Sequence, residues 1–306
     1  MRFFIALLFA LFTLFAPAFA QPGAVTVTAS LAPTVEENSL LWRITGKELS
    51  TPSYLYGTIH LIGKDDFFLT DSTLAFLEKS QKVTFEINME ELMNLPAQLK
   101  LMMKSFMDGG KTLRDLLSAD DYALVKKHFD KMGLPLFLFE RMKPMFLTVF
   151  ASLDMSPNSM STGDMVSYEM KIMDIAKQQK KKIGGLETAE YQMSMFDSIP
   201  YETQAQMLVE SIKSNDAGST EFDEMVQLYK NQDINGMVAM MRADEDGIGS
   251  YEDLLLVTRN KNWIPVMGEM MMKQPTFFAV GAGHLGGEMG VVALLRSEGY
   301  TVEPVR

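Results

Sequence analysis

The sequence predicts an α/β fold, in which a sheet built from strands at both chain ends carries a large helical insertion. Short apolar runs rich in β-branched and aromatic residues occur between residues 40 and 87 and again between 276 and 302. Apolar spacing typical of helices fills most of the region between them. In addition, two of the apolar runs end in the same Gly-Xaa-Xaa-His pattern, which suggests that they end at the same edge of one sheet.

The first 20 residues are typical of a secretory signal peptide. An apolar stretch from Phe3 to Phe15 follows one basic residue, and Ala18–Ala20 provides a cleavage site of small residues. This stretch is too short to favour a membrane anchor, and no later stretch is apolar for long enough to span a bilayer. We therefore expect a periplasmic or secreted protein with no membrane span after cleavage.

Residues 21–37 are rich in Ala, Thr, Ser and Pro without apolar periodicity, which predicts a flexible leader. The remaining residues, 38–306, suit a single α/β domain. Within it, the apolar runs 40–44 and 53–58, joined by a polar turn, predict a strand hairpin. A third strand is expected at 82–87, after a helical segment.

Helices are expected from about 90 to 180, with Ser/Thr-Xaa-Xaa-acid start signals at 112–115 and 118–121. The following elements are predicted in order: a strand at 182–187, helices over 188–273, a strand at 276–281, a helix at 288–297 and a strand at 300–302.

Composition excludes several kinds of chemistry. The chain has no cysteine, so it has no disulfide and no thiolate nucleophile, and any metal must be held by His, Asp or Glu. Its formal net charge of -11 disfavours binding to nucleic acid.

Two of the three histidines occur in the same setting, an apolar strand followed by Gly-Xaa-Xaa-His. The two segments are Gly57–His60 and Gly281–His284. Glycine at a strand end allows close approach of the backbone, which makes Gly57 and Gly281 secondary candidates for the site. If the two strands are central neighbours, both imidazoles converge at the sheet edge where α/β sites form.

Glu86 is the third candidate, because it stands at the end of a strand where an unpaired carboxylate is costly to bury. Together with His60 and His284 it would suit Zn, Mn, Co or Fe, with open positions for water and substrate. The same groups also suit metal-free chemistry, with a histidine as general base that Glu86 orients. A salt bridge between Glu86 and an Arg or Lys is the structural alternative.

Charged residues elsewhere are secondary candidates. Arg259 lies in an otherwise apolar helix and could hold a substrate carboxylate or an oxyanion, pair with Glu187 at the end of strand 182–187, or lie at the surface. Asp164 and Glu169 stand on a predicted helix where charges are usually solvated, and Glu288 opens the last predicted helix.

Several segments resemble the TraB/GumN (TraB/PrgY/GumN) family, which includes the Tiki proteases. They are Leu41–Ile44, Tyr56–His60, Gly281–His284, Gly286, Gly290 and Gly299–Tyr300, and the resemblance extends from about 40 to 304. The resemblance implies a fold similar to erythromycin esterase and ChaN-like proteins. It also implies a metal-dependent peptidase that uses His60, His284 and Glu86, with Arg259 contacting substrate or transition state.

We therefore predict an exported metal-dependent hydrolase of the Tiki/TraB type, with a divalent metal (Mn, Co or Zn) and a peptide or protein substrate. Two alternatives stay open from the residues. One is a non-catalytic periplasmic binding protein for peptide, haem or metal, and the other is a metal-free His/Glu hydrolase similar to the esterases.

Overall fold

The computed structural model describes residues 30–92, 94–152, 165–216, 221–243 and 251–306. The predicted signal peptide, most of the predicted leader and Asp164 lie outside these residues. Among the helices of the described ranges, none is both long and apolar enough to cross a membrane.

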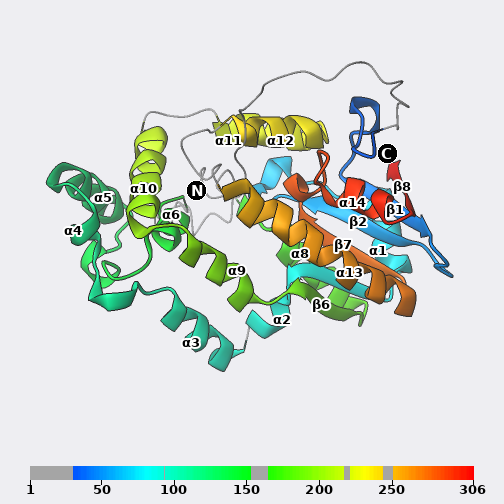
Figure 1. The fold of residues 1–306 in the computed structure, drawn as a ribbon, viewed down its shortest axis with the longest axis horizontal. Helices are drawn as coiled ribbons and strands as arrows, with labels where there is room; N and C mark the ends of the chain where they lie inside the picture. Colours follow the sequence, from blue (N-terminus) through cyan, green and yellow to red (C-terminus); the bar gives the residue numbers. More distant parts are fainter. Residues whose placement is uncertain (1–29, 93, 153–164, 217–220, 244–250) are drawn as a thin grey trace, which may run out of the picture.

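A six-stranded mixed sheet with the order β6-β4-β7-β2-β1-β8 forms the centre of the protein. Strands β6, β4, β7 and β2 are parallel, whereas β1 is antiparallel to both of its neighbours, β2 and β8. Blue strands from the beginning of the chain lie beside orange and red strands from its end, as predicted (Figure 1). The strands are β1 (Leu41–Gly46), β2 (Ser53–Thr58), β4 (Lys82–Ile87), β6 (Lys182–Glu187), β7 (Thr276–Gly281) and β8 (Tyr300–Val305).

Helices cover both faces of this sheet. Tyr54 and Tyr56 point to the same face of β2 because side chains alternate along a strand. Tyr54 stacks on Phe76 of α1 at 4.2 Å between ring centroids, and Tyr56 lies 6.2 Å from Tyr168 of α8. The opposite face carries α13 and α14, orange and red in Figure 1. These helices are α1 (Asp71–Lys79), α8 (Tyr168–Gln178), α13 (Thr258–Lys273) and α14 (Val291–Ser297).

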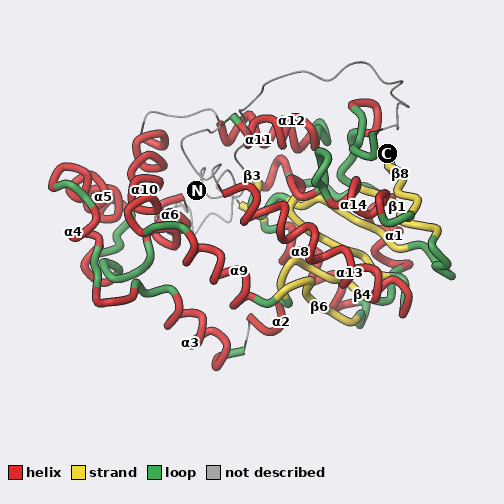
Figure 2. The backbone as a smooth tube through the Cα atoms, viewed as in Figure 1, coloured by secondary structure: helices red, strands yellow, loops and turns green. Residues whose placement is uncertain are grey.

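A second group of helices, the helical lobe, lies beside the sheet and has its own hydrophobic cluster, which includes Val125, Phe129 and Leu208. Figure 2 shows these helices in red, apart from the yellow strands. The lobe comprises α3 (Leu95–Lys104), α4 (Leu113–Leu116), α5 (Ala119–Lys131), α6 (Pro144–Ser152) and α10 (Tyr201–Asp216). Other helices are α2 (Met89–Leu92), α9 (Ala189–Met195), α11 (Glu221–Lys230) and α12 (Ile234–Arg242). Both predicted start signals are confirmed, with a capping box at Thr112 and an N-cap at Ser118.

Two details differ from the predicted elements. The last helix, α14, begins at Val291, so the prediction that Glu288 opens it is wrong. Gly290 has extended backbone angles (φ -73°, ψ 158°) and is the N-cap, so residues before it cannot belong to the helix. The second difference is a small sheet in which β3 (Ile62–Gly63) pairs with β5 (Met165–Val166).

The end of the predicted leader joins the fold. Val35–Glu37 form a 3-10 helix. The Glu37 carboxylate accepts a hydrogen bond from Arg296 Nη2 at 2.7 Å and one from Arg296 Nη1 at 3.1 Å.

Candidate functional site

The candidate site lies where the four parallel strands end. In sheet order, β6, β4, β7 and β2 lead to Glu187, Glu86, His284 and His60. The prediction that the two Gly-Xaa-Xaa-His strands are central neighbours is confirmed, because β7 pairs with β2. Carboxyl ends of adjacent parallel strands are where sites in α/β proteins form.

The first glycine of each motif allows close packing at this edge. A Cβ atom on Gly57 would lie 3.0 Å from Cα of Ala282, which belongs to the other motif. At Gly281 the backbone N–H donates to Glu86 Oε1 at 2.8 Å, and a Cβ there would lie 3.2 Å from the same oxygen. At both positions a side chain larger than that of glycine would crowd neighbouring atoms of the site.

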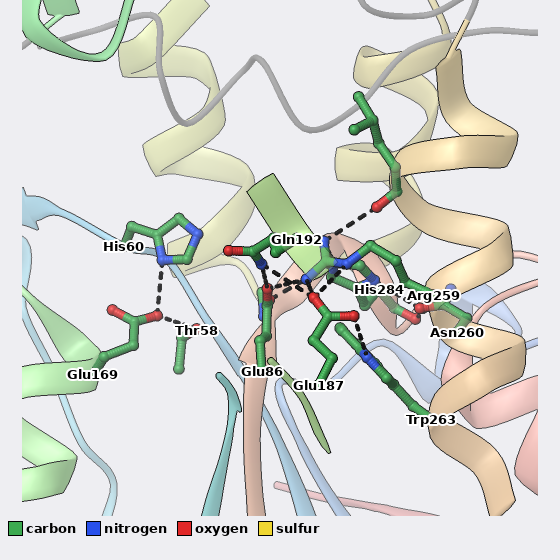
Figure 3. A network of polar contacts seen from close by, with 12 residues as sticks. Thr58, His60, Glu86, Glu169, Glu187, Gln192, Arg259, Asn260, Trp263 and His284 are labelled. Carbon is green, nitrogen blue, oxygen red and sulfur yellow. Dashed lines mark hydrogen bonds and ion pairs between the residues drawn. The ribbon is translucent and has the colours of Figure 1, made fainter. Parts of the chain in front are cut away.

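Arg259 is the centre of the polar network, and its side chain is fully buried. Its Nη2 lies 2.5 Å from Glu86 Oε2, its Nε donates to Glu187 Oε1 at 2.9 Å, and its Nη1 donates to the Leu255 carbonyl at 3.1 Å (Figure 3). The predicted pairing of Glu187 with Arg259 is confirmed, as is the salt bridge considered for Glu86. A surface position for Arg259 is wrong, because α13 packs against the sheet.

The buried carboxylates respond differently to this cation. Burial opposes ionisation of Glu86, but the charges of Arg259 and of the two histidines outweigh it and hold the pKa of Glu86 well below its usual range. Burial raises the pKa of Glu187, and Arg259 offsets only part of that effect. Glu86 is thus the group held firmly as a carboxylate.

His284 is 1% exposed and is held as a neutral imidazole. The Asn260 amide nitrogen donates to the Met289 carbonyl, so its Oδ1 faces His284 Nδ1 at 2.6 Å and accepts a hydrogen bond from the Nδ1–H. The other ring nitrogen, Nε2, lies 3.2 Å from Arg259 Nη1 and therefore accepts. Burial, reinforced by the charge of Arg259, lowers the pKa of His284 to about 3, although Glu86 opposes this.

His60 forms a separate pair with Glu169 at the left of Figure 3. Its Nδ1 lies 3.0 Å from Glu169 Oε1, which also accepts from the Thr58 hydroxyl at 2.7 Å. Burial acts to lower the pKa of His60, but the charge and hydrogen bond of Glu169 outweigh it and raise the pKa above its ordinary value. The His60 side chain is 38% exposed, so solvent weakens both effects.

Sequence reasoning ranked Glu169 too low and missed Gln192. The small β3–β5 sheet places the Glu169 segment beside the His60 segment, and strands of two residues each leave no readable pattern. Gln192, from α9, donates to Glu86 Oε2 at 3.1 Å and to Glu187 Oε1 at 3.3 Å. Glu288, a predicted secondary candidate, is exposed in the turn before α14 and does not border the site.

The three predicted ligands border one small cavity. His60, Glu86 and His284 line a space of about 20 Å³, enough for roughly one water molecule or ion. Each histidine has its Nδ1 tied to an oxygen acceptor, the arrangement that orients Nε2 of metal-ligating histidines. Glu86 Oε1 lies 3.7 Å from His284 Nε2.

This donor set fits a divalent cation in its chemistry, since two imidazoles and a carboxylate suit Zn, Mn or Co. Within the described ranges, no three His, Asp or Glu side chains stand close enough to hold a metal together as they are placed. Ligation by all three predicted residues would therefore require their side chains to close on the cavity and Arg259 Nη1 to release His284 Nε2.

Comparison with known proteins supports one family. The TraB/PrgY/gumN family pattern matches residues 40–304. The chain is 25% identical to Metalloprotease TIKI1 of Danio rerio, with 92% of this chain and 66% of that protein covered. It is 25% identical to Metalloprotease TIKI1 of Homo sapiens (92% and 65% covered) and 23% identical to Metalloprotease TIKI2 of Danio rerio (87% and 61% covered).

The chain thus spans somewhat less than two thirds of the length of these relatives. No solved structure matches it, so the likeness to erythromycin esterase and ChaN-like folds stays a prediction.

Proposed function

Because this chain belongs to the TraB/PrgY/gumN family, we propose that it is an exported metal-dependent peptidase whose metal ligands are His60, Glu86 and His284. The observation that carries the proposal is that these three side chains, from three adjacent parallel strands, border one cavity. The names of its relatives, all metalloproteases, support the same class of reaction.

A divalent cation bound there would polarise the scissile carbonyl and make water a stronger nucleophile at neutral pH. The residues of the chain supply the setting for this chemistry. His284 is neutral and Glu86 ionised, which are the protonation states that ligands need. His60, whose pKa Glu169 raises, would have to release its proton when a cation binds.

Arg259 acts as a positioning residue. Its guanidinium holds Glu86 and Glu187 in place and lies beside His284 Nε2. Every nitrogen of the Arg259 guanidinium already has a partner within the protein, so direct contact with substrate would require one of these bonds to be exchanged. Its charge also favours negative charge that develops at the carbonyl oxygen nearby.

A metal-free hydrolase is the second candidate, and the His60–Glu169 pair favours it. A carboxylate on Nδ1 fixes the tautomer of an imidazole and leaves Nε2 to move a proton, which is the arrangement of a general base and its orienting acid. In this version Glu169, rather than the predicted Glu86, orients the base.

The test combines metal analysis with peptide digestion. Protein purified without chelator is assayed for bound metal and for cleavage of a peptide mixture with added Mn²⁺, Co²⁺ or Zn²⁺. We expect close to one ion per chain, loss of both metal and cleavage in His284→Ala, and retention of both in His128→Ala. His128 is the matched control because it lies in α5 of the helical lobe.

The alternatives separate in the same experiment. Cleavage that survives complete removal of metal but disappears in Glu169→Gln would favour the metal-free hydrolase. Bound metal without cleavage of any peptide would contradict a peptidase and favour a binding protein.

A further inference from the structure

A large apolar cavity adjoins the candidate site. Its volume is about 460 Å³, which falls within the range of small-molecule and peptide-binding pockets. The apolar lining comes from the end of β4, from α6 and α9, and from a π-helix that precedes α13. Six of these residues are Ile87, Met89, Phe146, Met193, Phe196 and Leu255.

Three of these side chains are only partly covered by the rest of the protein. Phe146, Met193 and Phe196 are each partly exposed and line the cavity. Phe146 and Phe196 meet edge to face at 5.7 Å between ring centroids. They therefore present apolar surface to the cavity.

Polar residues of the candidate site border the same cavity. They are His60, Glu86, Glu169, Gln192 and Arg259. A group seated among the phenylalanines and methionines would therefore share one cavity with two of the proposed ligands, His60 and Glu86. A mostly apolar cavity that borders a proposed site is suited to select the side chain of a substrate.

Building on the proposed peptidase, we propose that this cavity binds a large apolar side chain of the substrate, such as leucine, methionine or phenylalanine, next to the scissile bond. Apolar walls stabilise such a side chain by removing it from water. An acidic side chain would lose its hydration among these apolar walls. Flexible methionines can adapt to more than one apolar shape, so the preference is for a class rather than for one residue.

The experiment uses two heptapeptides that differ only in the central residue, leucine or aspartate. Both kcat/KM for cleavage and Kd from calorimetry are measured on the metal-loaded protein. We expect the leucine peptide to be favoured by about tenfold or more in both quantities, the size expected from burying one large apolar side chain.

Met193→Glu tests the pocket itself, and Met272→Glu is its matched control. Met193 lines the cavity, whereas Met272 is 57% exposed on α13 and does not border it. We expect Met193→Glu to remove most of the preference for leucine with bound metal unchanged, and Met272→Glu to leave the preference intact. Circular dichroism establishes that each variant is folded, and Met193→Gln replaces Met193→Glu if the charge prevents folding.

The outcomes distinguish the two proposals. Cleavage of both peptides with equal kcat/KM overturns the apolar pocket but leaves the peptidase standing. Tighter binding of the leucine peptide that depends on Met193, without any cleavage, supports the pocket and contradicts the peptidase. Absence of both cleavage and selective binding overturns both.

Discussion

The two Gly-Xaa-Xaa-His motifs have the same local design but opposite environments. Each histidine follows a parallel strand at the same sheet edge, and each uses Nδ1 to contact an oxygen acceptor. For His284 the acceptor is the amide of Asn260, and the ring is buried and neutral. For His60 the acceptor is the carboxylate of Glu169, and the ring is partly exposed with a raised pKa.

The difference shows that the motif and the partner control separate properties. The strand and its glycine determine where the imidazole stands, because β2 and β7 are paired in register. The surroundings determine the charge of each ring: burial and Arg259 keep His284 neutral, whereas Glu169 raises the pKa of His60. The same sheet edge thereby carries one imidazole that stays neutral and another that holds a proton more tightly.

The largest expected effect comes from replacing Arg259, the buried positive charge beside His284. Arg259→Leu leaves Glu86 and Glu187 buried without a positive partner, which should lower the free energy of unfolding by about 3–5 kcal/mol. Urea unfolding followed by circular dichroism measures this. Arg259→Lys is the control, because it keeps the charge but cannot reproduce the planar contacts, and it should cost less. Equal stability of wild type and Arg259→Leu would contradict the role given to this arginine.

The second prediction converts His284 into a histidine like His60. Asn260→Asp places a carboxylate on Nδ1, so the pKa of His284 should rise well above its present value of about 3. Proton NMR titration of the imidazole in metal-free protein measures the change. Asn260→Ala, which removes the acceptor without adding charge, is the control. An unchanged pKa in Asn260→Asp would show that burial alone determines the charge of His284.

The third prediction removes the carboxylate beside His60. Its effect on the histidine pKa should be smaller than that of Asn260→Asp, because His60 is partly solvated. Glu169→Gln should lower the pKa of His60, since the charge that raises it is removed. The pair stabilises the protein fully below the unfolded histidine pKa of about 6.5, and this contribution disappears as pH rises through the folded pKa. It also disappears in acid as Glu169, whose pKa is lowered, takes up a proton.

Urea unfolding of metal-free protein at about pH 6 and about pH 10 should therefore show that Glu169→Gln is more destabilising at the lower pH. A destabilisation of equal size at both values would mean that Glu169 acts by packing rather than by charge.

The smallest effect is expected at a surface ion pair, which provides a reference for the buried network. Glu37→Gln should cost less than about 1 kcal/mol, because the Glu37–Arg296 pair is partly exposed. The hydrogen bond from Arg296 lowers the pKa of Glu37, so this contribution is present above the unfolded pKa and is lost as pH falls. Thermal unfolding with and without high salt measures it, and a loss as large as that in Arg259→Leu would contradict the comparison.

The strands and half of the site could be predicted from local patterns. The runs 82–87, 182–187 and 276–281 are strands with the predicted bounds. The last of them is almost entirely apolar, as is typical of a parallel strand that is buried on both faces. His60, His284 and Glu86 could be singled out because each stands at or just after such a strand.

The rest depends on contacts between distant segments. Glu169 reaches His60 through the two-residue strands of β3 and β5, and Gln192 reaches Glu86 from α9. The sequence around Glu169 and Gln192 does not indicate these contacts, since a glutamate or glutamine on a helix is usually solvated.

The position of β7 in the sheet has a consequence for how the protein is made. Thr276–Gly281 insert between β4 and β2, which are synthesised far earlier. Until β7 arrives, both older strands have an unpaired edge and are prone to associate with other chains. His284, which follows β7, is also missing at that stage, so His60 and His284 come together only when nearly the whole sequence has been made. Completion of the sheet is therefore a late folding step that depends on contacts between distant segments.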